Sequence, residues 1–212
     1  MIDQARRESL LPFTTLLLAT GNAGKTVELR KLLSGIPVDL IDLSVFVSVG
    51  QVAETGSTFR ENAEIKASGY AKATGVYAVA DDSGLEVFAL GGEPGVHSAR
   101  YGGPGMNDSE RTELLLENMR HLSINDRSAQ FTAAISLARP DGEILYTCDA
   151  VCPGSIALSP VGNNGFGYDP VFIPEGFDLT FGELSHGVKL KISHRSKASA
   201  IFVRFLLDFT GF

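Results

Sequence analysis

The stretch Phe13-Thr14-Thr15-Leu16-Leu17-Leu18-Ala19-Thr20-Gly21-Asn22-Ala23-Gly24-Lys25 predicts a buried strand that passes through a loop of small residues into a helix. Its first half is an apolar run rich in strand-forming residues, and a helical pattern follows the loop as far as Leu33. Backbone N–H groups at the start of a helix bind anions, and glycine lets the backbone approach them closely. We therefore expect the loop from Thr20 to Lys25 to bind phosphate, with the Lys25 ammonium adding a mobile positive charge.

This loop has two other interpretations. Residues 19–26 nearly match the P-loop of nucleotide kinases and NTPases, but Ala19 stands where that pattern has its first glycine. In a P-loop enzyme the strand over 76–80 and Asp81 would hold Mg²⁺. That interpretation leaves the downstream motifs without a role. A plain turn between strand and helix would leave Lys25 as a surface side chain.

Strands and helices alternate along the rest of the chain. The hydrophobic patterns predict strands over 38–43, 76–80, 130–138 and 143–152, and helices over 58–74, 108–121 and 193–209. Residues 85–90 continue the strand at 76–80 or pair with it. The helix over 58–74 begins with a capping box, Thr58-Phe59-Arg60-Glu61, and a hairpin turns at Pro140-Asp141-Gly142. The alternation predicts an α/β fold, and the hairpin makes its sheet mixed.

The composition excludes several classes of protein. The 212 residues suit one large domain, or two lobes that share a cleft, with residues 1–12 as a short N-terminal extension. The net charge of −7 argues against a general nucleic-acid-binding protein, which would carry basic patches. No apolar run is long enough to span a membrane, and we expect a cytoplasmic protein without a signal peptide. Cys148 and Cys152 fit no zinc pattern and are expected to be reduced structural thiols.

Acidic residues occur at two points that suit a metal ion. Glu54 comes just before a predicted helix, and Asp81 and Asp82 end an apolar strand. Carboxylates that face a phosphate site provide the hard oxygen ligands that Mg²⁺ prefers, and one carboxylate can take a proton from an attacking water. Adjacent Asp side chains point to opposite faces of a strand, so at most one of the two faces the metal directly. The alternative is a simple turn over 81–84, and the presence of Lys66 and Glu54 favours the functional interpretation.

Two later segments combine groups that recognise nucleotides. The loop Gly162-Asn163-Asn164-Gly165-Phe166-Gly167-Tyr168-Asp169-Pro170 sets two aromatic side chains among glycines, and an aromatic ring stacks on a base for roughly 1–3 kcal/mol. The last predicted helix begins at Ser193-His194-Arg195, an N-cap followed by two hydrogen-bond donors, with Lys189 and Lys191 ahead of it. The simpler interpretations are that the aromatic rings pack in the core and that the helix start is solvated.

The ordered set of these motifs resembles the inosine/xanthosine triphosphate pyrophosphatase family. The matching segments run in family order from about Leu16 to the C-terminal helix. They are Thr20-Gly21-Asn22-x-x-Lys25, Glu54-Thr55-Gly56, Phe59-x-Glu61-Asn62-Ala63, Lys66, Ala80-Asp81-Asp82-Ser83-Gly84-Leu85, Gly91-Gly92-x-Pro94-Gly95-x-x-Ser98-Ala99-Arg100-Tyr101, Gly165-Phe166-Gly167-Tyr168-Asp169-Pro170 and Ser193-His194-Arg195. One motif alone is a weak signal, whereas the ordered set is specific.

The resemblance implies a fold and a reaction. The implied fold is an elongated mixed sheet flanked by helices, with residues 13–212 forming one domain of two lobes around a central cleft, in a homodimer. The implied reaction is Mg²⁺-dependent hydrolysis of ITP, dITP and XTP to the nucleoside monophosphate and diphosphate. Such a protein removes unwanted purine nucleotides from the nucleotide pool.

The resemblance also implies roles for individual residues. Glu54 and Asp82 are the implied Mg²⁺ ligands, with Asp82 also accepting the proton of water and Asp81 in support. The implied substrate-binding residues are Thr20, Gly21, Asn22, Ala23, Gly24, Lys25 and Lys66 for the triphosphate, with Ser83, and Phe166, Gly167, Tyr168, Asp169, Lys189, His194 and Arg195 for the base and sugar.

Two other functions compete with this one. A P-loop kinase would transfer the γ-phosphoryl group to an acceptor substrate. A non-catalytic regulator would bind a nucleotide without turnover, and the intact acidic residues Glu54, Asp81 and Asp82 argue against it.

Overall fold

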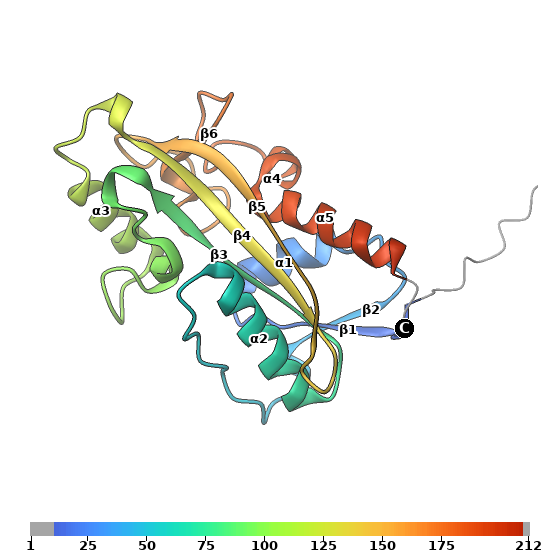
Figure 1. Ribbon diagram of the computed structural model, residues 1–212. Helices are drawn as coiled ribbons and strands as arrows, with labels where there is room; N and C mark the ends of the chain where they lie inside the picture. Colours follow the sequence, from blue (N-terminus) through green and yellow to red (C-terminus); the bar gives the residue numbers. More distant parts are fainter. Residues whose placement is uncertain (1–10, 210–212) are drawn as a thin grey trace, which may run out of the picture.

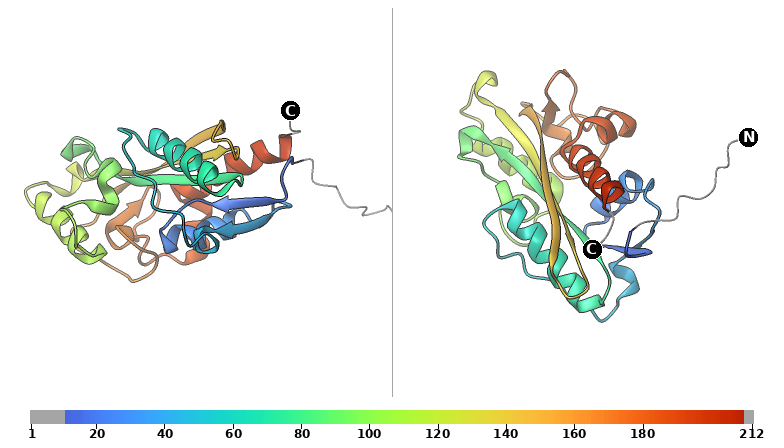
Figure 2. Two further views of the ribbon diagram at one scale, coloured as in Figure 1. Left: turned by 90° about the horizontal axis from the view of Figure 1, so that it is seen from below. Right: turned by 45° about the vertical axis from the view of Figure 1, so that its right-hand side comes forward.

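The computed structural model describes residues 11–209, whose strands and helices are drawn in Figure 1. Its strands are β1 (Thr15–Leu18), β2 (Asp39–Asp42), β3 (Ala78–Val87), β4 (Ser128–Ala138), β5 (Ile144–Ile156) and β6 (Phe172–Pro174). Its α-helices are α1 (Ala23–Leu32), α2 (Phe59–Thr74), α3 (Asp108–Asn118), α4 (His186–Ile192) and α5 (His194–Asp208). The molecule is elongated, with α3 at one end and β1 and β2 at the other (Figure 2).

The strands form one mixed sheet in the order β2-β1-β3-β4-β5-β6. β1 pairs in parallel with β2 and β3, whereas the pairs β3–β4, β4–β5 and β5–β6 are antiparallel. This confirms the predicted α/β class and the mixed sheet. Leu16, Leu17 and Leu18 are all fully buried, because β1 is an inner strand with both faces covered.

β3 is longer than predicted, and one of its edges is only partly paired. In the described part of the chain it pairs with β4 along its whole length but with β1 only at Ala78 and Val79. The prediction that the strand ends at Asp81 and Asp82 is wrong, because pairing with β4 keeps even the turn-forming residues 83–84 in the ladder. Of the two alternatives for residues 85–90, continuation of this strand is confirmed as far as Val87. In the described part of the chain no strand pairs with this edge between Val79 and Leu85, so that stretch can border a pocket, and beyond it Glu86 forms an isolated antiparallel bridge with Pro94.

Helices cover both faces of the sheet with apolar side chains. On one face α1 and α5 contribute Leu29 and Phe202 to a cluster with β1 and β4. On the opposite face α2 packs through Ala67, Tyr70 and Ala71. A third cluster joins α3 to the distant parts of β3 and β4. The core therefore follows the length of the sheet.

Local signals in the sequence determine where several elements begin and turn. The predicted capping box is present, since the Glu61 N–H donates to Thr58 Oγ1 (3.1 Å) and the Thr58 N–H donates to Glu61 Oε2 (3.2 Å). In the β4–β5 turn, Gly142 has a φ of +89° and donates its N–H to the Arg139 carbonyl (2.8 Å). The predicted start of α2 and the predicted hairpin are both confirmed.

The C-terminal region contains one helix that the sequence did not predict. The Ser193 side chain accepts a hydrogen bond from the Ser196 N–H, as expected of the N-cap of α5. Ser193 also ends the short helix α4, which contains the helix-weakening Gly187. Helix propensity alone does not predict α4, and its inward face carries the buried Lys189.

Cys148 and Cys152 are free and buried, which confirms their predicted structural role. Burial raises the pKa of each thiol to about 11. Since the thiolate is the reactive form, we expect neither cysteine to react with Ellman's reagent at about pH 8 in the folded protein, and both to react in denaturant. Rapid reaction before unfolding would contradict this placement.

Two further expectations concern the N-terminal extension and membrane-spanning segments. Most of the predicted extension, residues 1–10, lies outside the described residues, and Leu11 packs against the cluster that contains Phe202. Within residues 11–209, no helix combines the length and apolar character needed to cross a membrane.

Candidate active site

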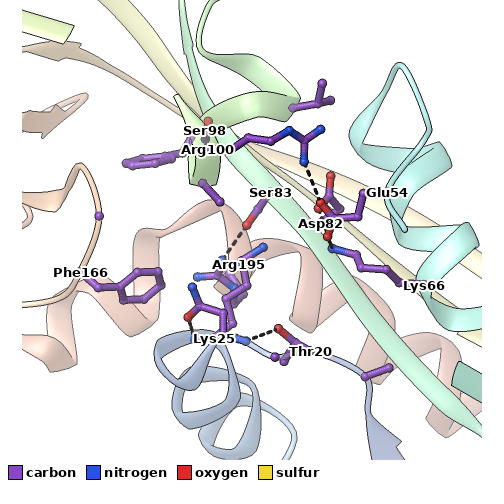
Figure 3. A pocket seen from close by; sticks show the side chains of 18 of the residues that line it. Thr20, Lys25, Glu54, Lys66, Asp82, Ser83, Ser98, Arg100, Phe166 and Arg195 are labelled. Atoms are coloured by element: carbon purple, nitrogen blue, oxygen red, sulfur yellow. Dashed lines mark hydrogen bonds and ion pairs between the residues drawn. The ribbon is translucent and has the colours of Figure 1, made fainter. Parts of the chain in front are cut away.

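A pocket of about 730 Å³ lies along the free edge of β3, next to the β1–α1 loop (Figure 3). Here β1 is flanked by β2 on one side and β3 on the other, and ligands of open α/β sheets bind at such a change in strand order. Of the residues predicted for the site, those that line this pocket are Thr20, Gly21, Asn22, Lys25, Glu54, Lys66, Asp82, Ser83, Phe166, Gly167, Tyr168, Asp169, Lys189, His194 and Arg195. Ala23, Gly24 and the buried Asp81 do not line it.

The β1–α1 loop is shaped by Asn22 at the N-cap of α1. The Asn22 side chain accepts a hydrogen bond from the Lys25 N–H (3.0 Å), and the Asn22 N–H donates to Thr20 Oγ1 (3.2 Å). Gly24 packs against the Phe166 ring, which a Cβ at this position would approach to 2.8 Å. The loop thus brings a helix N-terminus, which attracts anions, to the pocket.

Asp81 is fully buried and pairs with two cations of the site. Its Oδ1 lies 2.7 Å from Lys25 Nζ, and its Oδ2 lies 3.3 Å from Arg195 Nε. Burial opposes its ionisation, but Arg195 and Lys25 hold the pKa of Asp81 well below its usual range. In a P-loop enzyme the equivalent Asp would hold Mg²⁺, whereas Asp81 pairs with the lysine of the loop itself.

Glu54 and Asp82 meet at the Lys66 ammonium. Lys66 Nζ lies 2.9 Å from Glu54 Oε1 and 2.6 Å from Asp82 Oδ1, and it donates to the Asp81 carbonyl (2.9 Å). Asp81 and Asp82 therefore point to opposite faces of β3, as the sequence predicts. Burial opposes the charge of Lys66, but the two carboxylates raise its pKa, and burial raises the pKa of Asp82.

This carboxylate pair suits a divalent cation that binds together with a phosphate. No group of three or more His, Cys, Asp or Glu side chains within residues 11–209 is arranged to hold a metal ion. Glu54 and Asp82 nevertheless both line the pocket and converge on one positive group. Mg²⁺ needs few protein ligands, because waters and phosphate oxygens complete its octahedron. The donor set therefore fits Mg²⁺ bound with a nucleotide.

The loop before β6 is held closed by the buried Asp169. Asp169 Oδ2 accepts hydrogen bonds from the Phe166 N–H (2.8 Å) and from Lys189 Nζ (2.6 Å). Gly165 has a φ of +76°, and a Cβ there would overlap Asp169 Oδ2, so the closure requires glycine. Lys189 Nζ lies 4.7 Å from the centre of the Phe166 ring, within cation–π range. The Tyr168 hydroxyl donates to a backbone carbonyl in the core, so Phe166 is the half-buried aromatic of the pair.

Glu28 is the main buried residue of this region that the sequence analysis missed. Its Oε1 lies 2.8 Å from Lys189 Nζ, and its Oε2 pairs with Arg195. It ties α1 to α4 and α5 from behind the pocket wall. Lys25, Glu28 and Leu29 have the spacing of one helix face, and the buried Leu29 was the signal that Glu28 points inward.

His194 and Arg195 differ in how firmly they are held. Arg195 donates to Ser83 Oγ (2.7 Å) in addition to its ion pairs, so its guanidinium is fixed. His194 stacks on Phe131 with ring centres 4.7 Å apart, and its Nδ1 has no partner within residues 11–209. Burial lowers the pKa of His194 well below its usual value. The neutral imidazole therefore offers one donor and one acceptor.

Comparisons with known proteins cover nearly the whole chain. The model of the Ham1 family matches residues 16–205. A protein of Thermus thermophilus named dITP/XTP pyrophosphatase is 49% identical over 182 residues, which are 86% of this chain and 86% of that protein. One of Syntrophobacter fumaroxidans with the same name is 48% identical over 183 residues, or 86% of this chain and 78% of that protein.

Solved structures agree with the fold described above. The structure of a HAM1 protein from Coxiella burnetii superposes with a TM-score of 0.84 at 41% identity, covering 92% of this chain and all of that one. The Staphylococcus aureus Ham1 protein gives a TM-score of 0.81 at 40% identity, covering 92% of this chain and 98% of that one. The similarity thus extends over both the sheet and the pocket-forming segments.

Proposed function

The chain belongs to the Ham1 family, and we propose on that premise that it hydrolyses ITP, dITP and XTP to the nucleoside monophosphate and diphosphate. Relatives named dITP/XTP pyrophosphatase support the reaction class. The structural observation that supports it most directly is that one pocket is bordered by the β1–α1 loop, the carboxylate pair and the Phe166 loop. Nothing in the comparisons favours the P-loop kinase, and the Lys25–Asp81 pair argues against it.

Triphosphate and metal bind on the side of the pocket where Lys25, Lys66 and the carboxylates lie. The loop from Thr20 to Lys25 contributes the N-terminus of α1 to the phosphates. Glu54 and Asp82 are the ligands for Mg²⁺. When bound, the metal ion neutralises the charge of the phosphate oxygens and of the leaving diphosphate.

The chemical step is attack by water on the α-phosphorus. A bond forms between the water oxygen and this phosphorus, the bond to the bridging oxygen breaks, and diphosphate leaves. Asp82 accepts the water proton: burial raises the pKa of this carboxyl against the opposing effect of Lys66, and the raised pKa strengthens it as a base. The Lys25 and Lys66 ammonium groups stabilise the negative charge that develops.

Recognition of the base combines stacking with hydrogen bonding. Hypoxanthine and xanthine have a carbonyl group at C6, where adenine has an amino group. A buried hydrogen-bond donor that faces C6 pairs with this carbonyl but is left unpaired by adenine. The cost of the unpaired donor discriminates strongly against adenine nucleotides. Phe166 provides the stacking surface, and His194 provides a neutral imidazole whose Nδ1 is not already bonded within residues 11–209. Lys189 and Arg195, each held by Glu28, border the same region.

Phe166→Ala is expected to weaken binding of a purine nucleotide by about fivefold to 150-fold, because stacking on an aromatic ring contributes roughly 1–3 kcal/mol per base. Isothermal titration with inosine monophosphate measures this loss. Phe177→Ala is the matched control, since Phe177 is exposed and does not line the pocket. Equal affinities of both variants would remove Phe166 from the base site.

The proposed function is tested by identifying phosphorus products. Purified protein is incubated with Mg²⁺ and with ITP, XTP, ATP or GTP in turn, and the products are resolved by phosphorus NMR. Diphosphate and monophosphate from ITP and XTP, with little from ATP or GTP, are expected. Orthophosphate with a nucleoside diphosphate would instead indicate cleavage at the γ-phosphoryl group. Binding without turnover would indicate a regulator.

We also propose that the protein acts as a homodimer, as the resemblance of its sequence implies. Light scattering of the purified protein should give twice the chain mass of 22.6 kDa. A monomer mass at micromolar concentration would contradict this.

A further inference from the structure

Arg100 belongs to the motif Gly91–Tyr101, to which the proposed function gives no role. It ends the 3₁₀ helix Gly95–Arg100, which lies directly on β3. A Cβ at Gly84 would overlap Ser98 Oγ, and the Leu85 N–H donates to the same oxygen (2.9 Å). The glycine in β3 therefore allows a close contact that fixes the start of the Arg100 side chain.

The Arg100 guanidinium lies in the pocket beside Glu54. Its Nη1 is 3.4 Å from Glu54 Oε2, a long ion pair, and its Nε donates to His97 Nδ1 (3.2 Å). Nη2 has no partner among residues 11–209. Figure 3 shows the side chain extending toward Glu54 and Asp82, on the opposite side of the pocket from Phe166. Arg100 thus has unused hydrogen-bond donors where the proposed function puts the phosphates.

The charges around the pocket balance one another. Among the described residues, two ion-pair networks at the pocket together contain five cations, Lys25, Lys66, Arg100, Lys189 and Arg195, and five anions, Glu28, Glu54, Asp81, Asp82 and Asp169. A nucleoside triphosphate brings several negative charges of its own. Binding a nucleoside triphosphate therefore requires additional positive charge in the pocket. It also requires side-chain cations that can leave a carboxylate partner and bind a phosphate group instead.

Of these five cations, Arg100 is the one best able to exchange partners. Its side chain is 45% exposed, whereas the side chains of Lys25, Lys66, Lys189 and Arg195 are at most 13% exposed. Its carboxylate partner Glu54 is already bound through the other oxygen to Lys66 (2.9 Å). Loss of the Arg100 contact therefore leaves Glu54 paired.

We propose that Arg100 is a phosphate-binding residue of this pocket, and that its guanidinium moves from Glu54 to the triphosphate when a divalent cation binds at Glu54 and Asp82. The inference rests on the proposed function. A cation at the carboxylates removes the attraction that holds Arg100 at Glu54, and the planar guanidinium then binds phosphate oxygens with two parallel hydrogen bonds. Binding of the metal and of the nucleotide is coupled through this exchange.

Titration calorimetry with the α,β-methylene analogue of ITP, which resists the proposed cleavage, tests this exchange. With Mg²⁺ present, Arg100→Ala should weaken analogue binding about tenfold or more, and Arg100→Lys should lie between it and the native protein. Without nucleotide, Arg100→Ala should bind Mg²⁺ as tightly as the native protein or more tightly, because Glu54 loses a competing cation. Arg120→Ala, at an exposed ion pair outside the pocket, is the matched control and should match the native protein.

Two results would overturn the proposal. One is equal analogue affinity for Arg100→Ala and Arg120→Ala. The other is weaker Mg²⁺ binding by nucleotide-free Arg100→Ala with an equal loss of analogue affinity, because Arg100 would then only position Glu54. Failure of the proposed function is seen separately in the native protein, as absence of diphosphate production from ITP. Thermal unfolding checks that the variants are folded, and Arg100→Lys distinguishes the same outcomes if Arg100→Ala is unstable.

Discussion

Asp82→Asn is expected to lower the rate of ITP hydrolysis by about a thousandfold or more while the protein remains folded. The substitution keeps the shape of the side chain but removes both the base that accepts the water proton and one carboxylate of the metal site. The Lys66 ammonium, 2.6 Å from Asp82 Oδ1, retains Glu54 as an ionic partner. Steady-state release of diphosphate measures the rate, and circular dichroism checks the fold.

Asp149→Asn is the matched control for this experiment. Asp149 is an Asp on β5 that is half exposed, pairs with Arg60 and does not line the pocket. Its variant should turn over ITP at the native rate. If Asp82→Asn were as active as Asp149→Asn, Asp82 would be neither the proton acceptor nor a required metal ligand.

Asp81→Asn is expected to lower the free energy of unfolding by about 3–5 kcal/mol, because removing one partner of a buried ion pair leaves the other charge uncompensated. Asp81 is fully buried between Lys25 and Arg195, so both cations lose a partner. Urea denaturation followed by circular dichroism measures the change. Asp149→Asn again serves as control, since an exposed ion pair contributes only about 0–1 kcal/mol. Similar losses in the two variants would show that the Asp81 pairs contribute little.

The lowered pKa of the Asp81 carboxyl leads us to expect that the free energy of unfolding depends on pH. Burial opposes its ionisation, but Arg195 and Lys25 keep the pKa of Asp81 well below its unfolded value. The stabilisation is therefore complete above the unfolded pKa and is lost as the pH falls toward the folded one. We expect the free energy of unfolding to decrease below about pH 4, and to decrease less steeply in Asp81→Asn. Equal slopes would contradict this assignment.

The parts of the fold that local chemistry determines were predictable from the sequence. The capping box at Thr58 starts α2 by hydrogen bonds within one turn, and Gly142 turns the hairpin through its own backbone conformation. The length of β3 was not predictable in this way. The sequence 81–84 favours a turn, and only its pairing with β4, a strand that comes much later in the chain, keeps it extended.

The same distinction applies to the candidate site. Single motifs contain the residues that line the pocket, so Lys25, Asp82 and Phe166 could be selected from sequence. The ion pairs that orient them connect distant segments, such as Lys189 with Glu28, whose positions are separated by 161 residues. A glutamate on a helix is normally solvated, and although the spacing from Leu29 places Glu28 on the inward face of α1, its partners become known only from the packing of α1 against α4 and α5.

The most direct test of the central claim, water attack at the α-phosphorus, is hydrolysis of ITP in oxygen-18 water with Mg²⁺. With enzyme in excess over ITP, each substrate molecule reacts once, and mass spectrometry of both products locates the label. We predict that the oxygen from water appears in the nucleoside monophosphate and not in the diphosphate. Label in the diphosphate would mean attack at the β-phosphorus, and would contradict the proposed role of the pocket.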